Sequence, residues 1–285
     1  MSANGAGVER PVPELRIDPL TGLRTILAPA GEVLVPAREG ERPLTEPPPR
    51  PGANASRDLF WSAPALGAHE RLEDPAQPLD PLAQLSAEQL ELAVERWRER
   101  MRAHADAACL HLTVSDRGDG PRPVAVDLYA LPFVPAQLAR ERERFAAYAT
   151  RTMGGNALAD LVQEEVRQRE RIVAIDDEAV CMAPYASRVP FQLMIAPRLP
   201  RPRFEEEGPS GARLLHGVLG KLARVLGSSP ALTLWVRTAP RGAEHYCWRI
   251  DVLPGARQPG GLELGAGLSV NELPPELAAA RLREA

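Results

Sequence analysis

Residue types that carry chemistry are few in this sequence and lie far apart. Cys109, Cys181 and Cys247 are odd in number and show no Cys-x-x-Cys spacing. This pattern favours reduced core thiols over a disulfide framework or a metal knuckle. His111 stands alone in a strand-like segment, and His245 precedes another in EHYCW. An isolated histidine of this kind predicts a structural role more readily than a catalytic one.

The stretch Val124–Pro135, VAVDLYALPFVP, organises the chain around these sparse residues. Val124, Val126 and Leu128 alternate with other residues, which predicts a half-buried strand. The prolines of LPFVP predict a turn, because proline is excluded from central strands. A helix is expected to begin near Ala136.

Composition is that of a globular protein able to build a sizeable core, with 285 residues, 44% hydrophobic and 25% charged. A formal net charge of −4 argues against nucleic-acid binding. The sequence has no apolar run near the roughly 18 residues that a membrane span needs, and its first residues lack the pattern of a signal peptide. We therefore expect a cytoplasmic protein that binds neither membrane nor nucleic acid.

Further helices and strands flank the central stretch. Ser86 is placed to cap a helix whose apolar stripe contains Leu90, Val94, Trp97 and Met101. Other helices are predicted at 152–173, 210–226 and 274–285. Strands are predicted at 24–28, 109–114, 179–183, 191–196, 232–239, 245–254 and 268–270, with a Gly-rich loop before the last of them.

The helix predicted at 152–173 is amphipathic. Its buried face is expected to hold Leu158, Leu161, Val162 and Val166. Its solvated face is expected to hold Glu164, Glu165, Arg167, Arg169 and Arg171.

Strands next to helices without regular βαβ alternation predict an α+β fold with antiparallel sheet. The order strand, strand, helix, strand, strand occurs on both sides of about residue 150. We therefore predict a disordered terminus at 1–14, one domain at 15–150 and a related domain at 151–285. The proline-rich segment 34–56 is expected to be a loop or linker.

Several segments, in this order, resemble the galactose-1-phosphate uridylyltransferases of the histidine-triad superfamily. They are RIDPLTG at Arg16, PALGAHE at Pro64, AVERWRER at Ala93, SDRG at Ser115, LYALPFVPAQLARERERF at Leu128, APYASRVPF at Ala183, VRTAPRG at Val236, WRIDVLP at Trp248 and GGLELGAGLSVN at Gly260. The resemblance implies two histidine-triad-like domains, each an antiparallel sheet with packed helices, and a homodimer.

In that family the strand before LYALP carries His-Pro-His-x-Gln. Its second histidine attacks the α-phosphorus of UDP-glucose, since a neutral imidazole is a good nucleophile at neutral pH. The motif places the nucleophile at Ala125, the glutamine at Asp127 and the preceding histidine at Pro123. Alanine has no lone pair to attack with, and a carboxylate at 127 should repel an anionic phosphate unless it is protonated or bridged by a cation.

The family's metal ligands are also replaced. The zinc-type members use a Cys-x-x-Cys near the N-terminus, yet 35–56 contains no cysteine. Asp116 stands where the family usually has asparagine, and Cys247, Arg249 and Asp251 stand where it has histidines. Glu165 matches a metal-binding glutamate of some members, but without histidine partners it is interpreted as a surface residue. No metal or other cofactor is expected.

These substitutions favour a non-catalytic member, a pseudoenzyme that retains binding of a nucleotide sugar or sugar phosphate or acts through protein contacts. Guanidinium groups suit bidentate phosphate recognition. The candidate ligand-binding residues are therefore Asp116, Arg117, Asp127, Arg188, Arg237, Arg241 and His245. One alternative is an active nucleotidyltransferase or hydrolase whose chemistry has moved to His245, His216, Cys247 or Asp127. Another is an α+β binding protein outside the family.

Overall fold

The computed structural model of the chain describes residues 14–27, 67–72, 80–118, 124–227, 229–255 and 260–285. The predicted disordered residues before Glu14, the proline-rich segment 34–56 and Pro123 lie outside these residues. Glu14 itself is the first residue of a strand, β1, that the sequence did not predict.

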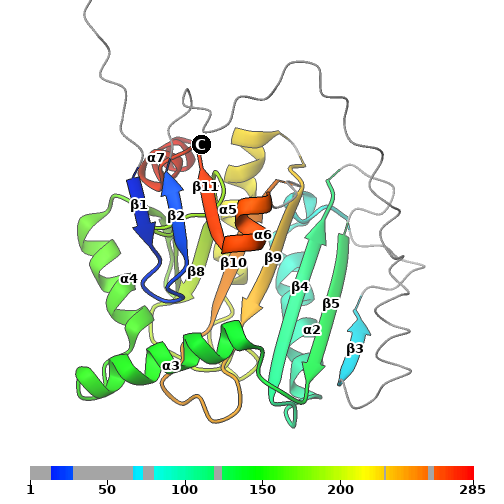
Figure 1. Ribbon diagram of the computed structural model, residues 1–285. Coiled ribbons are helices and arrows are strands. Elements are labelled where there is room, and N and C mark those ends of the chain that lie inside the picture. Colours follow the sequence, from blue (N-terminus) through cyan, green and yellow to red (C-terminus); the bar gives the residue numbers. More distant parts are fainter. Residues whose placement is uncertain (1–13, 28–66, 73–79, 119–123, 228, 256–259) are drawn as a thin grey trace, which may run out of the picture.

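An eight-stranded antiparallel sheet forms the body of the protein (Figure 1). In spatial order its strands are β3 (Ala68–Arg71), β5 (Val124–Leu131), β4 (Cys109–Asp116), β9 (Leu232–Arg237), β10 (Arg249–Pro254), β8 (Leu193–Pro197), β7 (Ala179–Met182) and β6 (Ile172–Ile175). Pairing of β4 with β9 joins the strands of the two predicted halves into one sheet. The predicted α+β class with antiparallel sheet is confirmed, and the domain boundary near residue 150 stays a prediction.

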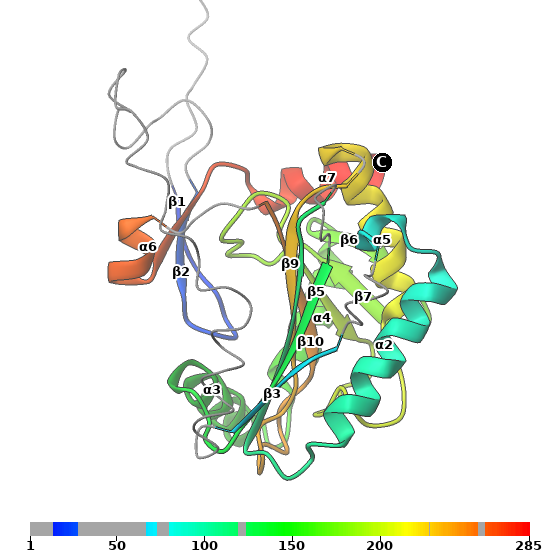
Figure 2. The same cartoon turned by 90° about the vertical axis from the view of Figure 1, so that its right-hand side faces the viewer.

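One face of this sheet is covered by α2 (Ala87–Arg102), the short 3₁₀ helix η2 (Leu82–Gln84), α5 (Ala212–Leu226) and α7 (Pro275–Glu284), as Figure 2 shows for α2 and α5. Ser86 caps α2 as predicted: its Oγ accepts from the Gln89 amide at 3.2 Å, and the Gln89 side chain accepts from the Ser86 amide at 2.8 Å. The predicted stripe of α2 faces the core, where Leu90 and Met101 are fully buried. Even-numbered residues of β5 point into the same core.

The opposite face has two coverings. Helices α3 (Ala136–Arg151) and α4 (Ala157–Gln168) pack over the end of the sheet that contains β8, β7 and β6, through a cluster that includes Phe145, Leu158 and Met194. A small sheet of β1 (Glu14–Ile17), β2 (Arg24–Leu27) and β11 (Leu268–Asn271) stands in front of the large one, with α6 (Gly261–Ala266) on its outer side (Figure 2). β11 runs parallel to β2, a pairing of the two chain ends that the sequence did not predict.

Two local predictions were wrong because backbone turns were not recognised. The helix predicted at 152–173 ends at Gln168, where Arg169 adopts a left-handed conformation with φ of 59°, and the chain then enters β6. The loop predicted before residue 268 contains α6, whose first turn is closed by a hydrogen bond from the Gly260 amide to Glu263 Oε2 at 2.8 Å. The sequence did not predict this helix because it contains glycines, which have low helix propensity.

The solvated face predicted for this helix was also partly wrong. Glu165 is 2% exposed and Arg171 is 8% exposed. Arg171 donates to Glu165 Oε1 from Nε at 3.0 Å and from Nη2 at 2.9 Å, and it also donates to Glu276 at 2.8 Å. Glu276 in turn accepts from Arg16 at 2.7 Å, so this buried network ties the N-terminal strand to the C-terminal helix.

Candidate functional site

The candidate site occupies the face of the large sheet that α2 and α5 leave uncovered. Successive strand residues point to opposite faces, so the odd-numbered residues of β5 lie on the side that faces α3 and the small sheet (Figure 2). Ala125 lies here, opposite Ser115 of β4, which itself lies opposite Thr233 of β9. A methyl group with hydroxyl neighbours therefore stands at the position predicted for the nucleophile.

Asp127 is bridged by two basic side chains of the edge strand β3. Its Oδ1 lies 2.8 Å from His69 Nε2 and 3.7 Å from Arg71 Nε. The His69 ring is buried and stacks on Tyr129 with ring centroids 4.6 Å apart. From the sequence, the Asp127 carboxylate was expected to repel a phosphate. In the structure it is paired with the side chains of His69 and Arg71. His69 was missed as a site residue because only the register of β3 against β5 places it beside Asp127.

Two arginines lie close to Trp235 of β9: Arg237 of the same strand, and Arg188 of the loop between β7 and β8. The guanidinium carbons of Arg188 and Arg237 lie 5.4 and 5.7 Å from the Trp235 ring centroid, within cation–π range. Arg237 is 9% exposed, and its Nε is 3.6 Å from Asp251 with no hydrogen-bond partner among the described residues. Trp235 Nε1 donates to the same carboxylate at 2.9 Å. Burial lowers the pKa of Arg188, with Arg237 acting in the same direction and Asp251 against it.

A buried ion pair supports this cluster. Arg249, 3% exposed, donates from Nη1 to Glu141 Oε1 of α3, and its Nε lies 3.3 Å from Asp251. Tyr246 donates to the same Glu141 oxygen at 2.9 Å. The carboxylates keep the pKa of Arg249 raised despite its burial, so a permanent positive charge lies opposite Arg237 on the same side of the sheet.

The loop that carries Arg188 is held by the small sheet. Asn271 of β11 donates to the Ser187 carbonyl at 3.0 Å and to the Val189 carbonyl at 3.3 Å. Thr25 of β2 donates to the Ala186 carbonyl at 3.1 Å. Both ends of the chain therefore position Arg188, although neither end was predicted to approach it.

No protein-family model matches the chain. A galactose-1-phosphate uridylyltransferase of Haemophilus influenzae is 26% identical over 217 residues, which are 73% of this chain and 61% of the relative. The enzyme of the same name from Cryptococcus neoformans is 34% identical over 71 residues, which are 25% of this chain and 19% of the relative. In sequence the chain is therefore similar to galactose-1-phosphate uridylyltransferases. The matched part is less than two thirds of either relative's length.

Solved structures with the fold of these uridylyltransferases match almost the whole chain. An ADP-glucose phosphorylase of Arabidopsis thaliana with bound ADP-glucose has a TM-score of 0.73 at 20% identity, over 96% of this chain and 99% of that one. A uridylyltransferase structure has a TM-score of 0.66 at 19% identity, over 96% and 98% of the two chains. The likeness confirms the predicted α+β fold, which this chain shares with these structures.

The side of the large sheet that carries Asp127, Trp235 and Arg237 is called the polar face below. The other candidate residues predicted from the sequence are placed as follows. Asp116 ends β4, where its carboxylate accepts from the Leu82 amide at 2.7 Å and the Gly118 amide at 2.8 Å, a structural role. Arg117 follows it and is exposed. Arg241 donates to the Asp106 carbonyl, and His245 is exposed in a turn whose carbonyl accepts from Asn156. The structure therefore brings together Arg188, Arg237 and Asp127 on one face, whereas Asp116, Arg241 and His245 have contacts elsewhere.

His111 does lie on the polar face, on β4 opposite Tyr129. Burial lowers its pKa to about 4, with Arg237 contributing in the same direction. This imidazole is therefore neutral at neutral pH.

Within the described ranges, no group of three or more His, Cys, Asp and Glu residues is arranged to hold a metal ion. Nor does any helix of the described part have the length and apolar character to span a membrane.

Proposed function

We propose that this chain is a member of the galactose-1-phosphate uridylyltransferase family that binds a nucleotide sugar or sugar phosphate on the polar face of its large sheet. Ala125, at the position of the family's nucleophile, cannot form a covalent uridylyl-histidine. The observation that carries the proposal is the pair of guanidinium groups around Trp235. In the described part of the chain, neither guanidinium donates a hydrogen bond to a carboxylate. Their N–H groups remain available to phosphate oxygens, which arginine binds in bidentate fashion.

Two further points support this ligand class. The Arabidopsis neighbour of the same fold was solved with ADP-glucose bound. In this chain Ala125 removes the attacking group, whereas the pairing of Asp127 with His69 and Arg71 reduces the repulsion that a bound phosphate would meet. Binding is therefore favoured over the family's transfer reaction. A homodimer and a cytoplasmic location remain predictions, which sedimentation and fractionation would test.

Calorimetric titration with UDP-glucose, ADP-glucose and glucose 1-phosphate tests binding. Arg237→Met should weaken the affinity for whichever of these binds by at least about tenfold, since a hydrogen bond to a charged group contributes about 1.5–3 kcal/mol. Arg96→Met, an exposed arginine of α2, which covers the opposite face of the sheet, is the matched control and should change nothing. Equal losses in both variants, or no binding of any of the three ligands, would contradict the proposal.

A second candidate function is nucleotidyl transfer by a relocated histidine. The observation that favours it is His111, whose neutral imidazole lies on the same face as Arg237 and thus meets one requirement for a histidine nucleophile. Intact-mass analysis after incubation with UDP-glucose or ADP-glucose distinguishes the two functions. A nucleotide-sized mass increase that disappears in His111→Gln and persists in His245→Gln would establish this second function and refute the first.

A further inference from the structure

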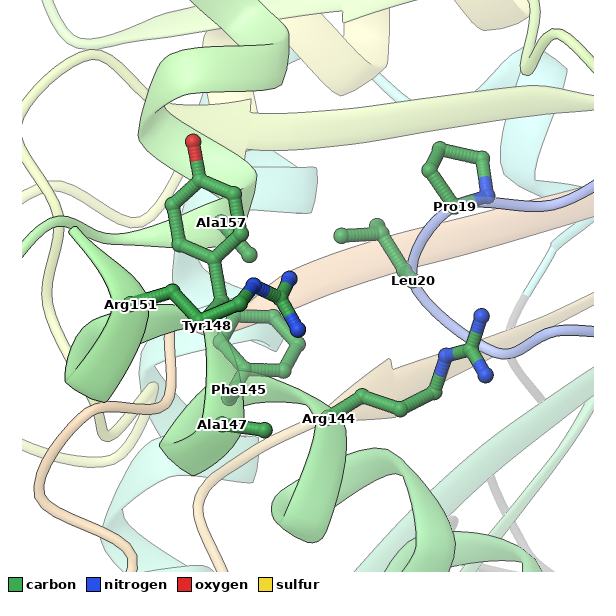
Figure 3. A pocket seen from close by; sticks show the side chains of 8 residues that line it. All are labelled: Pro19, Leu20, Arg144, Phe145, Ala147, Tyr148, Arg151 and Ala157. Carbon is green, nitrogen blue, oxygen red and sulfur yellow. The ribbon is translucent and has the colours of Figure 1, made fainter.

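A pocket lies on the same side of the large sheet as the polar face, between α3, the start of α4 and the turn after β1 (Figure 3). Its volume is about 190 Å³, and its lining includes Pro19, Leu20, Arg144, Tyr148 and Arg151. None of its lining residues belongs to a strand of the large sheet. Neither Arg188 nor Arg237 is among its lining residues.

Two arginines of α3 provide its positive charge. Arg144 and Arg151 are seven residues apart, nearly two helical turns, so they share one face of α3. Figure 3 shows both side chains extending toward the turn that carries Pro19 and Leu20. Both are exposed, and within the described residues neither forms an ion pair with a carboxylate. Their guanidinium N–H groups are thus available to a ligand.

The guanidinium of Arg144 is seated against a glycine. A Cβ atom added to Gly22 would lie 2.7 Å from Arg144 Nη1 and 2.9 Å from its Cζ. Gly22 also has φ of 73°, and its amide donates to the Asp18 carbonyl at 2.8 Å to close the turn. Glycine at this position therefore allows the close approach that holds the Arg144 head at the pocket, instead of leaving it free in solvent.

The rest of the lining is apolar or fixed in place. Leu20 is 4% exposed and Phe145 is 2% exposed, so the floor is part of the packed core. Tyr148 donates from its hydroxyl to Asp160 at 2.7 Å, and the Arg151 guanidinium carbon lies 5.8 Å from the Tyr148 ring centroid. The Asp160 carboxylate thus already accepts a hydroxyl donor.

We propose that this pocket binds a small phosphate monoester that carries a compact apolar group. The two guanidinium groups contact the phosphate, and the apolar group rests on Leu20 and Phe145. The volume of about 190 Å³ is smaller than the roughly 300–1,000 Å³ of pockets for drug-sized ligands, so it suits one compact molecule and not a whole nucleotide sugar.

Calorimetric titration of the full chain with phenyl phosphate and with inorganic phosphate tests this assignment. Phenyl phosphate should bind at least about fivefold more tightly than inorganic phosphate, because only the ester reaches the apolar floor. Arg144→Met and Arg151→Met should each weaken phenyl phosphate binding at least about tenfold. Arg140→Met, an exposed arginine of the same helix outside the pocket lining, is the matched control and should have no effect.

Gly22→Ala provides a second variant that leaves both arginines in place, and it should also weaken phenyl phosphate binding, since its Cβ displaces the Arg144 head. Circular dichroism of each variant verifies folding. Loss of phenyl phosphate binding in Arg237→Met but not in Arg144→Met would place the ester on the sheet face and overturn the assignment. Equal binding of the two probes would also overturn it. Both outcomes are independent of whether the polar face binds a nucleotide sugar.

Discussion

Replacing Arg249 with methionine tests the buried charge network between β10 and α3. Arg249 is 3% exposed and lies between two carboxylates, donating to Glu141 and approaching Asp251 at 3.3 Å. Methionine keeps much of the apolar stem and removes only the guanidinium. The change therefore isolates the charge, with little loss of packing.

The expected cost follows from what Glu141 loses. Glu141 is fully buried, and its Oε2 already has no partner among the described residues. After the substitution its remaining donor is the Tyr246 hydroxyl at 2.9 Å. Removing one partner of a buried ion pair costs about 3–5 kcal/mol, since the other charge stays buried without compensation. At about 2–4 °C per kcal/mol, the melting temperature should fall by roughly 6–20 °C.

Urea unfolding followed by circular dichroism measures the free energy of unfolding of Arg249→Met, Glu141→Leu and the double variant. The double variant should be more stable than the sum of the two single effects predicts, because it leaves neither charge unpaired. Arg167→Met removes an exposed pair with Glu164 at 3.5 Å and should cost less than about 1 kcal/mol. A loss below about 1 kcal/mol in Arg249→Met, or strict additivity in the double variant, would refute this reasoning.

Two predictions concern titrating groups in the core. Burial raises the pKa of the Cys109 and Cys247 thiols to about 11, and it also raises that of Cys181, so all three should resist Ellman's reagent at pH 8 in the folded protein and react once it is unfolded in guanidinium. Rapid labelling of the folded protein would contradict their burial. Burial lowers the pKa of His111 to about 4, so only the unfolded state binds a proton between pH 6.5 and pH 4. Its contribution to stability should be present above pH 6.5 and fall by up to about 1.4 kcal/mol per pH unit below it. His111→Phe should show a shallower loss than wild type over this window, and parallel pH profiles would count against the assignment.

Local periodicity was sufficient for most helices and strands. The stripe of Leu90, Val94, Trp97 and Met101 and the alternation in Val124–Leu131 each reflect contact with one apolar core, which imposes its period directly on the chain. Periodicity failed where polar groups are buried in pairs. Glu165 and Arg171 look like solvated residues until their mutual hydrogen bonds are seen.

The site shows the same division. Residue types identified Arg188 and Arg237 as phosphate-binding candidates, and the family resemblance identified Ala125 as a position without a nucleophile. Residue types equally suggested Arg241 and His245, which have contacts elsewhere. Nothing local distinguishes these arginines, because an arginine is defined as part of a site by its neighbours on other strands.

The amino-acid sequence was enough to establish the α+β class, the family resemblance and the absence of histidine from the β5 strand, because these depend on residue identity and short-range periodicity. Strand register and the packing of the two chain ends brought His69 to Asp127, Arg188 to Trp235 and Glu141 to Arg249. Those contacts join residues far apart in the chain. They form only when the burial of apolar surface offsets the entropy cost of ordering the segments between them. That balance depends on the whole fold, so local sequence does not reveal it.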